Sequence, residues 1–182
     1  MIILNNLGQY RRGKLWVNDL PRIDYDCIDI LELSLTINKG LELKPCNLAL
    51  ELLLSPRQVS NYAFLGAEFI PNSGDQLEIT ISVGNDEGEI LEDNIAAQLD
   101  EVHIGLPNEY GQAILRSVQK TLDELPNFSG GVLNFNIGAH GLVGSSQLSF
   151  SKVTEIIIKL LAGDPNNSDE NKLKDVVLGS LN

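Results

Sequence analysis

The sequence predicts an α+β protein, with an antiparallel or mixed sheet and two main helices on one face of that sheet. Three observations support this class. Apolar residues alternate with polar residues along several segments of the first half, which is the period of a half-buried strand. Two segments of the second half carry apolar residues at intervals of three and four, which is typical of an amphipathic helix. Short turn sequences rich in Gly, Pro, Asn and Asp separate these segments.

The N-terminal third is predicted to contain an irregular start and two strands. Residues 1–22 show no clear period, and Trp16 lies in a short strand or a docking segment. Ile28–Asn38 alternates between apolar and polar residues, and the consecutive apolar residues 30 and 31 indicate a β-bulge. Leu48–Leu54 also alternates, which predicts a strand, although its many leucines leave a helix open.

The next two strands are predicted to pair with each other. Tyr62–Ile70 and Leu77–Val83 flank the turn sequence "PNSGD", which favours a β-hairpin. Gly84–Asp93 follows as a polar, acidic loop. Its acids lack the alternate spacing and terminal Glu of an EF-hand calcium loop, so we expect a solvated connector.

The second half predicts a short strand, a helix, a strand and a second helix. Val102–Gly105 is the short strand, Pro107 suits the first position of the first helix, and Pro126 ends that helix. Leu133–Ile137 alternates as a strand. The two helices carry the apolar stripes Tyr110, Ala113, Ile114, Val118, Leu122 and Leu125, and Phe150, Val153, Ile157, Leu160 and Leu161.

The chain length suggests one α+β domain over residues 1–163. Residues 1–64 are expected either to extend the sheet or to form a small subdomain. Gly163 suits the end of the second helix, and residues 164–182 form a polar linker followed by a short docking helix or a frayed tail.

The charge of the chain favours protein partners over nucleic acid. The 182 residues include 25 acids and 13 Lys and Arg, for a net charge of -12. Nucleic-acid binding needs a concentrated basic surface, and only residues 11–22 gather several basic residues. The sequence therefore favours a solvated acidic surface that meets a basic protein, with Asp86, Glu87 and Glu89 as its candidate residues.

The sequence carries no recognisable catalytic or metal-binding motif. Its two histidines, His103 and His140, are far apart, and Cys27 and Cys46 lack CxxC spacing. No GxSxG elbow or Walker A lysine is present. We therefore expect no catalytic residues, metal or cofactor. An enzyme acting on a small anionic substrate is the least favoured of three possible functions. No apolar run approaches the about 20 residues of a membrane span, and we expect a cytoplasmic protein without a disulfide.

The segment Gly138–Ser146 is the strongest candidate binding loop. It joins a strand to a helix, its glycines permit tight backbone turns, and Ser145 or Ser146 should cap the helix. A helix N-terminus can hold an anion, but a glycine-rich capped turn gives the same pattern. The candidate binding residues are His140, Gly141, Gly144, Ser145 and Ser146.

Four features recur in a fixed order over residues 65–163: "LPNEY" at the start of the first helix, Gly130-Gly131-Val132, "GAHGLVGSS" at residues 138–146, and Phe150. Through these features the segment resembles domain IV of elongation factor G and its ribosomal-protection relatives. The order and spacing match, whereas His140 is one position early and Gly144 stands where the family has an acid. The family's glycine-rich tip is absent from residues 65–83.

The resemblance implies a ribosomal protein S5 domain 2-like core, with a left-handed βαβ connection, over residues 65–163. A weaker similarity of residues 142–146 to the phosphate loop of galactokinase-related kinases is consistent with the same fold geometry. Two functions remain open. The charge, the size and the lack of a catalytic cluster favour a non-catalytic protein-binding module, such as an adaptor, inhibitor or immunity-type protein. The resemblance favours a translation-associated module that contacts the ribosome or tRNA through Gly138–Ser146, although the charge opposes it.

Overall fold

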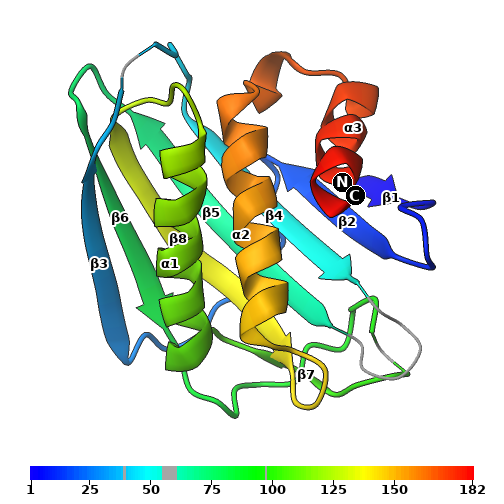
Figure 1. Ribbon diagram of the computed structural model, residues 1–182. Helices are drawn as coiled ribbons and strands as arrows, with labels where there is room; N and C mark the ends of the chain where they lie inside the picture. The colour runs from blue at the N-terminus through cyan, green and yellow to red at the C-terminus, as the bar shows by residue number, and fades with distance from the viewer. Residues whose placement is uncertain (39, 55–60, 97) are drawn as a thin grey trace.

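The fold is a mixed eight-stranded sheet with α-helices packed on one face (Figure 1). The computed structural model describes residues 1–38, 40–54, 61–96 and 98–182. The strands are β1 (Ile2–Leu4), β2 (Arg12–Val17), β3 (Asp29–Thr36), β4 (Cys46–Leu53), β5 (Tyr62–Pro71), β6 (Gln76–Val83), β7 (Val102–Ile104) and β8 (Gly131–Gly141). Their order across the sheet is β1-β2-β4-β5-β8-β6-β3, and β7 pairs with the end of β8.

The predicted hairpin of Tyr62–Ile70 with Leu77–Val83 is wrong. Both segments are strands, but β8 lies between them, antiparallel to β5 and parallel to β6. The connection from β5 to β6 therefore crosses two strand spacings, about 10 Å, which a four-residue link can span. Asn72 donates its backbone N–H to the carbonyl of Gly130 at 2.9 Å, so β8 begins directly against this turn.

The connection from β6 through α1 (Asn108–Glu124) to β8 is left-handed. In Figure 1 the arrows of β6 and β8 both point down, α1 lies in front of the sheet, and β8 lies to the right of β6. About 98 % of connections between parallel strands have the opposite hand. This connection also includes β7, which pairs with the far end of β8.

Two long helices cover one face of the sheet, as the periodicity predicts. They are α1 and α2 (Gln147–Ala162), and they lie side by side across the central strands (Figure 1). Leu125 is half-buried, and Pro107 is the N-cap of α1 rather than its first residue. The remaining predicted stripe residues are all buried, which confirms both faces: Tyr110, Ala113, Ile114, Val118, Leu122, Phe150, Val153, Ile157, Leu160 and Leu161.

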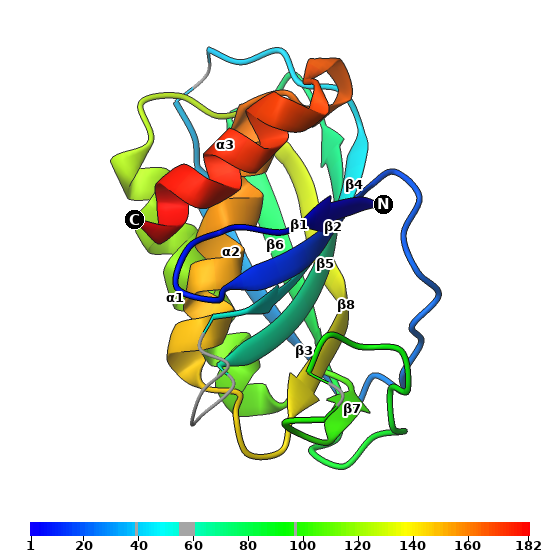
Figure 2. The same ribbon diagram turned by 90° about the vertical axis from the view of Figure 1, so that its right-hand side faces the viewer.

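The C-terminal segment is a docked helix. A short 3-10 turn at Pro165–Asn167 leads to α3 (Glu170–Leu181), which lies beside α2 (Figure 2). Its residues Leu173 and Val177 are buried in the main core. Arg11 donates to the carbonyl of Leu181 at 2.7 Å and so links the end of α3 to the N-terminal segment.

The N-terminal residues are more regular than their sequence suggests. Instead of an irregular start, β1 and β2 pair with each other, and β2 pairs with β4 from Arg12 to Val17. They extend the sheet, which is one of the two arrangements expected for residues 1–64. Trp16 lies on β2, and its ring packs 5.3 Å from the ring of Phe64.

The predicted bulge at residues 30 and 31 is absent. The register between β3 and β6 runs without a shift from Asp29 to Thr36. Ile30 instead keeps the alternation and lies exposed on the polar face, while Leu31 packs against the helix side. The register shift of the sheet occurs between Gly66 and Ala67, where β5 faces β8. No helix in the described ranges is both long enough and apolar enough to cross a bilayer.

Candidate functional site

The loop that follows β8 is held by a carboxylate from another part of the chain. Asp100 accepts hydrogen bonds from the backbone N–H of Val143 at 3.1 Å and of Gly144 at 2.6 Å. A Cβ atom at Gly141 would overlap the Asp100 carboxylate, so this close approach requires a glycine there. Asp100 thus occupies the backbone donors that the sequence suggests for an anion, and an added phosphate would have to displace it.

The two serines of this loop are also engaged within the chain. Ser146 caps α2 and forms a capping box with Ser149, whose N–H donates to the Ser146 hydroxyl at 3.1 Å. The Ser145 hydroxyl accepts the N–H of Gly141 at 2.8 Å and donates to the carbonyl of Tyr62. These bonds fix the end of β8 against β5 and the start of α2.

The two histidines, distant in sequence, lie opposite each other on β7 and β8. His103 and His140 are register partners, and their ring centroids are 6.2 Å apart. The ring of His140 is buried between the carbonyls of Gly105 at 3.0 Å and Asp86 at 2.8 Å. Both partners are backbone carbonyl oxygens, so the ring of His140 links β8 to residues 86 and 105.

His103 has a similar environment. Its ring nitrogens lie 2.7 Å from the carbonyl of Gly88 and 2.7 Å from a carboxylate oxygen of Glu101. Burial lowers the pKa of His103, but the hydrogen bonds to Glu101 and Gly88 and the charges of Glu101 and Glu87 raise it, and the net shift of the pKa is upward. The two histidines therefore clamp the acidic loop onto the end of the sheet.

The clamped loop presents its acids beside a second acidic segment. Asp86, Glu87 and Glu89 are all exposed. Glu87 and Glu89 line a pocket of about 270 Å³ together with Asp24 and Asp26, which precede β3. Among the ion pairs formed by the described residues, none includes any of these five carboxylates.

Two close backbone approaches position the walls of this pocket. The ring of Tyr25 lies against Gly84, where a Cβ atom would be 2.7 Å from the ring, and the Tyr25 hydroxyl donates to the carbonyl of Ser82 at 2.7 Å. A Cβ atom at Gly88 would overlap the carbonyl of Ile104. Burial, followed by the charge of Cys27, raises the pKa of Tyr25, so its hydroxyl stays protonated and can donate.

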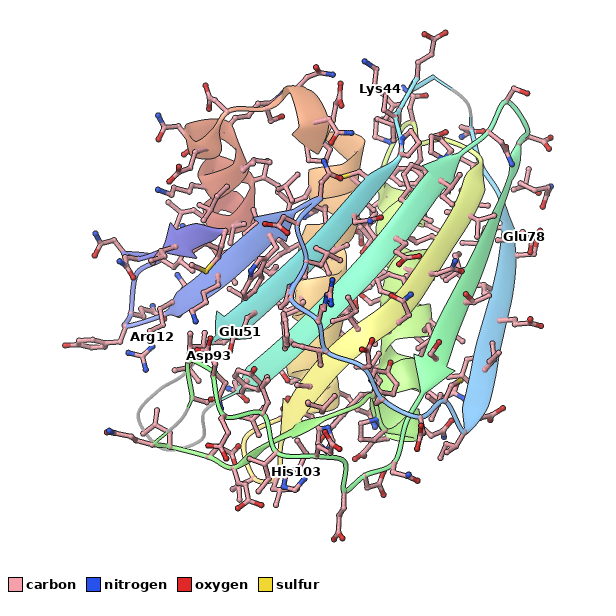
Figure 3. All side chains as sticks on the ribbon, turned by 180° about the vertical axis from the view of Figure 1, so that it is seen from behind. Arg12, Lys44, Glu51, Glu78, Asp93 and His103 are labelled. Carbon is pink, nitrogen blue, oxygen red and sulfur yellow. The ribbon has the colours of Figure 1, made fainter. Side chains whose placement is uncertain are left out.

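The sequence does not predict a buried carboxylate that contacts the segment just after the acidic loop. Glu51 of β4 is 2 % exposed, and one of its oxygens accepts from the Tyr62 hydroxyl and from the N–H of Ile95, each at 2.9 Å. Burial raises the pKa of Glu51, although these hydrogen bonds and the charge of Lys14 lower it. Figure 3 shows Glu51 near Asp93 on the face opposite the helices. Its contacts hold residues near 95 against the sheet.

The side chains of the N-terminal basic residues largely bond to other groups of the same chain. Arg11 donates to four groups, including Leu181 O and Asn182 Oδ1. Arg12 donates to the carbonyl of Ile95 at 2.8 Å, and Lys14 lies 3.5 Å from Asp93. These contacts leave less of the basic segment for phosphate binding.

The described residues contain no group of three or more His, Cys, Asp or Glu side chains placed to hold a metal ion. Cys27 is exposed and Cys46 is buried, and both are free thiols.

No protein-family model matches the chain, and neither a curated protein nor a solved structure matches it.

Proposed function

We propose that this protein is a non-catalytic protein-binding module, of the adaptor, inhibitor or immunity type, whose acidic face binds a basic partner. The observation that carries the proposal is the pocket lined by Asp24, Asp26, Glu87 and Glu89. Four carboxylates that form no ion pair among the described residues create a concentrated negative potential. A Lys or Arg side chain is the complementary group for such a pocket.

The wider sequence around the pocket supports the same partner. Residues 23–115 contain 17 acids and three basic residues, so the field of this region is strongly negative. Such a field steers a basic protein toward the pocket and repels nucleic acid. Exposed apolar residues adjoin the acids in sequence, including Ile28, which is 59 % exposed, and Ile90, which is 50 % exposed. A partner with mixed basic and apolar residues would use both kinds of contact.

The second candidate is a translation-associated module that contacts the ribosome or tRNA through Gly138–Ser146. It is favoured by the order of elements from β4 to α2 and by the left-handed β6–α1–β8 connection, which agree with a ribosomal protein S5 domain 2-like core. Fold alone does not determine function. The acidic charge and the Asp100 contacts within the loop oppose this candidate.

Affinity capture with charge variants tests the proposal. The pocket variant carries Asp24→Asn, Asp26→Asn, Glu87→Gln and Glu89→Gln. The matched control carries Glu42→Gln, Asp123→Asn, Glu124→Gln and Asp175→Asn, four exposed acids elsewhere with the same total charge change. We expect basic proteins bound by the wild type to be retained by the control and lost from the pocket variant.

The association rate of a captured partner gives the quantitative readout. Loss of electrostatic steering should slow association of the pocket variant by about tenfold or more at low salt, with a smaller effect at physiological salt. Equal capture by both variants would contradict the proposal. Salt-sensitive binding to ribosomes or tRNA, lost on neutralising Arg11, Arg12 and Lys14, would favour the translation function instead.

A further inference from the structure

The outer edge of β3 carries backbone hydrogen-bonding groups that have no partner strand among the described residues. β3 ends the strand order, so no strand within the described residues pairs with its outer side. Ile37, which follows the last residue of β3, donates its N–H to the carbonyl of Asp75 at 2.7 Å. In an antiparallel strand, the backbone N–H and C=O groups of every second residue point to the same side. Residues 29, 31, 33 and 35 therefore face β6, and residues 30, 32, 34 and 36 direct their N–H and C=O groups outward.

This edge lacks three of the usual protections against strand pairing. β3 has eight residues in unbroken register with β6, without a proline, a lysine or a bulge. Ile30 donates its N–H to the carboxylate of Asp29 at 2.8 Å, so one outward donor is occupied. The outward groups of Glu32, Ser34 and Thr36 remain as a row that an extended segment can match. In Figure 1 β3 forms one lateral border of the sheet.

The two faces of β3 specify the chemistry of the added strand. Leu31, Leu33 and Leu35 are half-buried beside the helix layer and can pack against apolar side chains of a neighbouring strand. The opposite face carries Glu32 and, on β6, Glu78, which is labelled near this edge in Figure 3. Cross-strand pairs favour opposite charges, so basic residues should face this side.

The edge is continuous with the acidic pocket. Asp24 and Asp26 of the pocket wall lie only a few residues before Asp29, where β3 begins. A second copy of the chain is a poor occupant, because pairing of two β3 edges would bring together the acids of two molecules that each carry a net charge of -12.

We propose that an extended segment of the basic partner adds to the sheet as a strand along β3, with apolar residues on the helix side and Lys or Arg on the open side. This mode of binding rests on the proposed function and specifies how the partner is held. Main-chain hydrogen bonds supply affinity, and the alternation of apolar and basic side chains supplies specificity.

A designed peptide of alternating Lys and Val tests strand addition. Its control is the same peptide with alternate backbone nitrogens methylated, which keeps the charge but cannot complete the hydrogen bonds. On the protein, Ser34→Pro removes one outward N–H and places a ring at the edge, a position where a sheet tolerates proline. Ser34→Ala is the matched control, because it loses the same hydroxyl and keeps the N–H.

We expect the unmethylated peptide to bind and to protect the amide protons of residues 32 and 34 from hydrogen exchange. N-methylation and Ser34→Pro should each weaken binding by about tenfold, the equivalent of one or two hydrogen bonds, whereas Ser34→Ala should leave affinity within about twofold. Circular dichroism of Ser34→Pro verifies that the sheet is retained. If that variant is unfolded, the N-methylated peptide and the exchange data on the wild type decide the test.

Two results would overturn strand addition. Equal, salt-dependent binding of both peptides, unaffected by Ser34→Pro, would show contact by charge alone and would leave the proposed function standing. Absence of binding by either peptide would reject the β3 site as well, and the proposed function would then be judged by the capture experiment with the pocket variant.

Discussion

The loop Gly138–Ser146 and the acidic pocket lie at the same end of the sheet, yet their polar groups are used in opposite ways. In the loop, Ser145 and Ser146 are engaged by hydrogen bonds within the chain, and Asp100 accepts from the loop backbone. In the pocket, the backbone is held firmly, while the carboxylates of residues 24, 26, 87 and 89 form no ion pair among the described residues. A conspicuous sequence pattern can thus serve internal structure, and a plain acidic segment can leave its charges exposed at the surface.

Replacing Asp100, which holds the loop Gly138–Ser146, by Ala should give the largest change in stability. The variant loses two hydrogen bonds from backbone N–H groups to a carboxylate, which should lower the free energy of unfolding by about 1.5–3 kcal/mol. Urea denaturation measures this loss. Asp93→Ala is the control, because its side chain is 94 % exposed and its contact to Lys14 is a surface ion pair. A wild-type midpoint for Asp100→Ala would mean that the loop does not depend on this carboxylate.

A double-mutant cycle should then link Asp100 to Gly141. Gly141→Ala forces the carboxylate away and should destabilise the wild type by about 1–3 kcal/mol, through the same lost hydrogen bonds. In the Asp100→Ala background the new methyl group no longer meets a carboxylate, so the second loss should be much smaller. Additive losses in urea denaturation would contradict the packing described for this loop.

The histidine clamp should make stability depend on pH. The folded-state pKa of His103 is raised, so its contribution is fully present below the unfolded pKa of about 6.5 and is lost as the pH rises through the folded pKa. His103→Gln should remove this part of the pH dependence. Urea denaturation of both proteins between about pH 5 and 9 measures it, and parallel curves would exclude His103 as the source.

Neutralising the pocket should have the smallest effect on stability. The variant with Asp24→Asn, Asp26→Asn, Glu87→Gln and Glu89→Gln loses repulsion between exposed acids. We expect a slight rise in Tm at low salt that fades near about 0.15 M salt, where the Debye length is about 8 Å. A large fall in Tm would instead assign these carboxylates a structural role. Circular dichroism melts at two salt concentrations distinguish these outcomes.

The sequence predicts where the helices and strands lie better than it predicts which strands pair with each other. Periodicity locates β3, β5, β6 and both long helices, because alternation and helical stripes are local properties. The hairpin error arises because the same periodicity does not say which strand lies beside which. β8 enters between β5 and β6 from about 60 residues further along the chain, and no local turn sequence encodes that insertion.

The candidate site likewise combines residues that the sequence reveals with partners that it does not reveal. The glycines and serines of residues 138–146 are visible in sequence, but Asp100, which binds their backbone, lies about 40 residues away. Glu51 was missed although a single acid within the leucine-rich strand β4 was a usable signal, since a charge buried there needs partners. Asp24 and Asp26 could not be joined to Glu87 and Glu89 without knowing that Tyr25 packs on Gly84.

The insertion of β8 also has a consequence for how the chain is synthesised. Val83 ends β6 and Gly141 ends β8, so 58 further residues must be added before the sheet can be completed. At typical elongation rates of about 5–20 residues per second, the inner edges of β5 and β6 lack their native neighbour for roughly 3–12 s. During that interval the two strands can meet each other in the hairpin that their shared turn favours. Arrival of β8 must then separate or pre-empt that pairing, which makes the last strand the one that joins two half-sheets into a single layer.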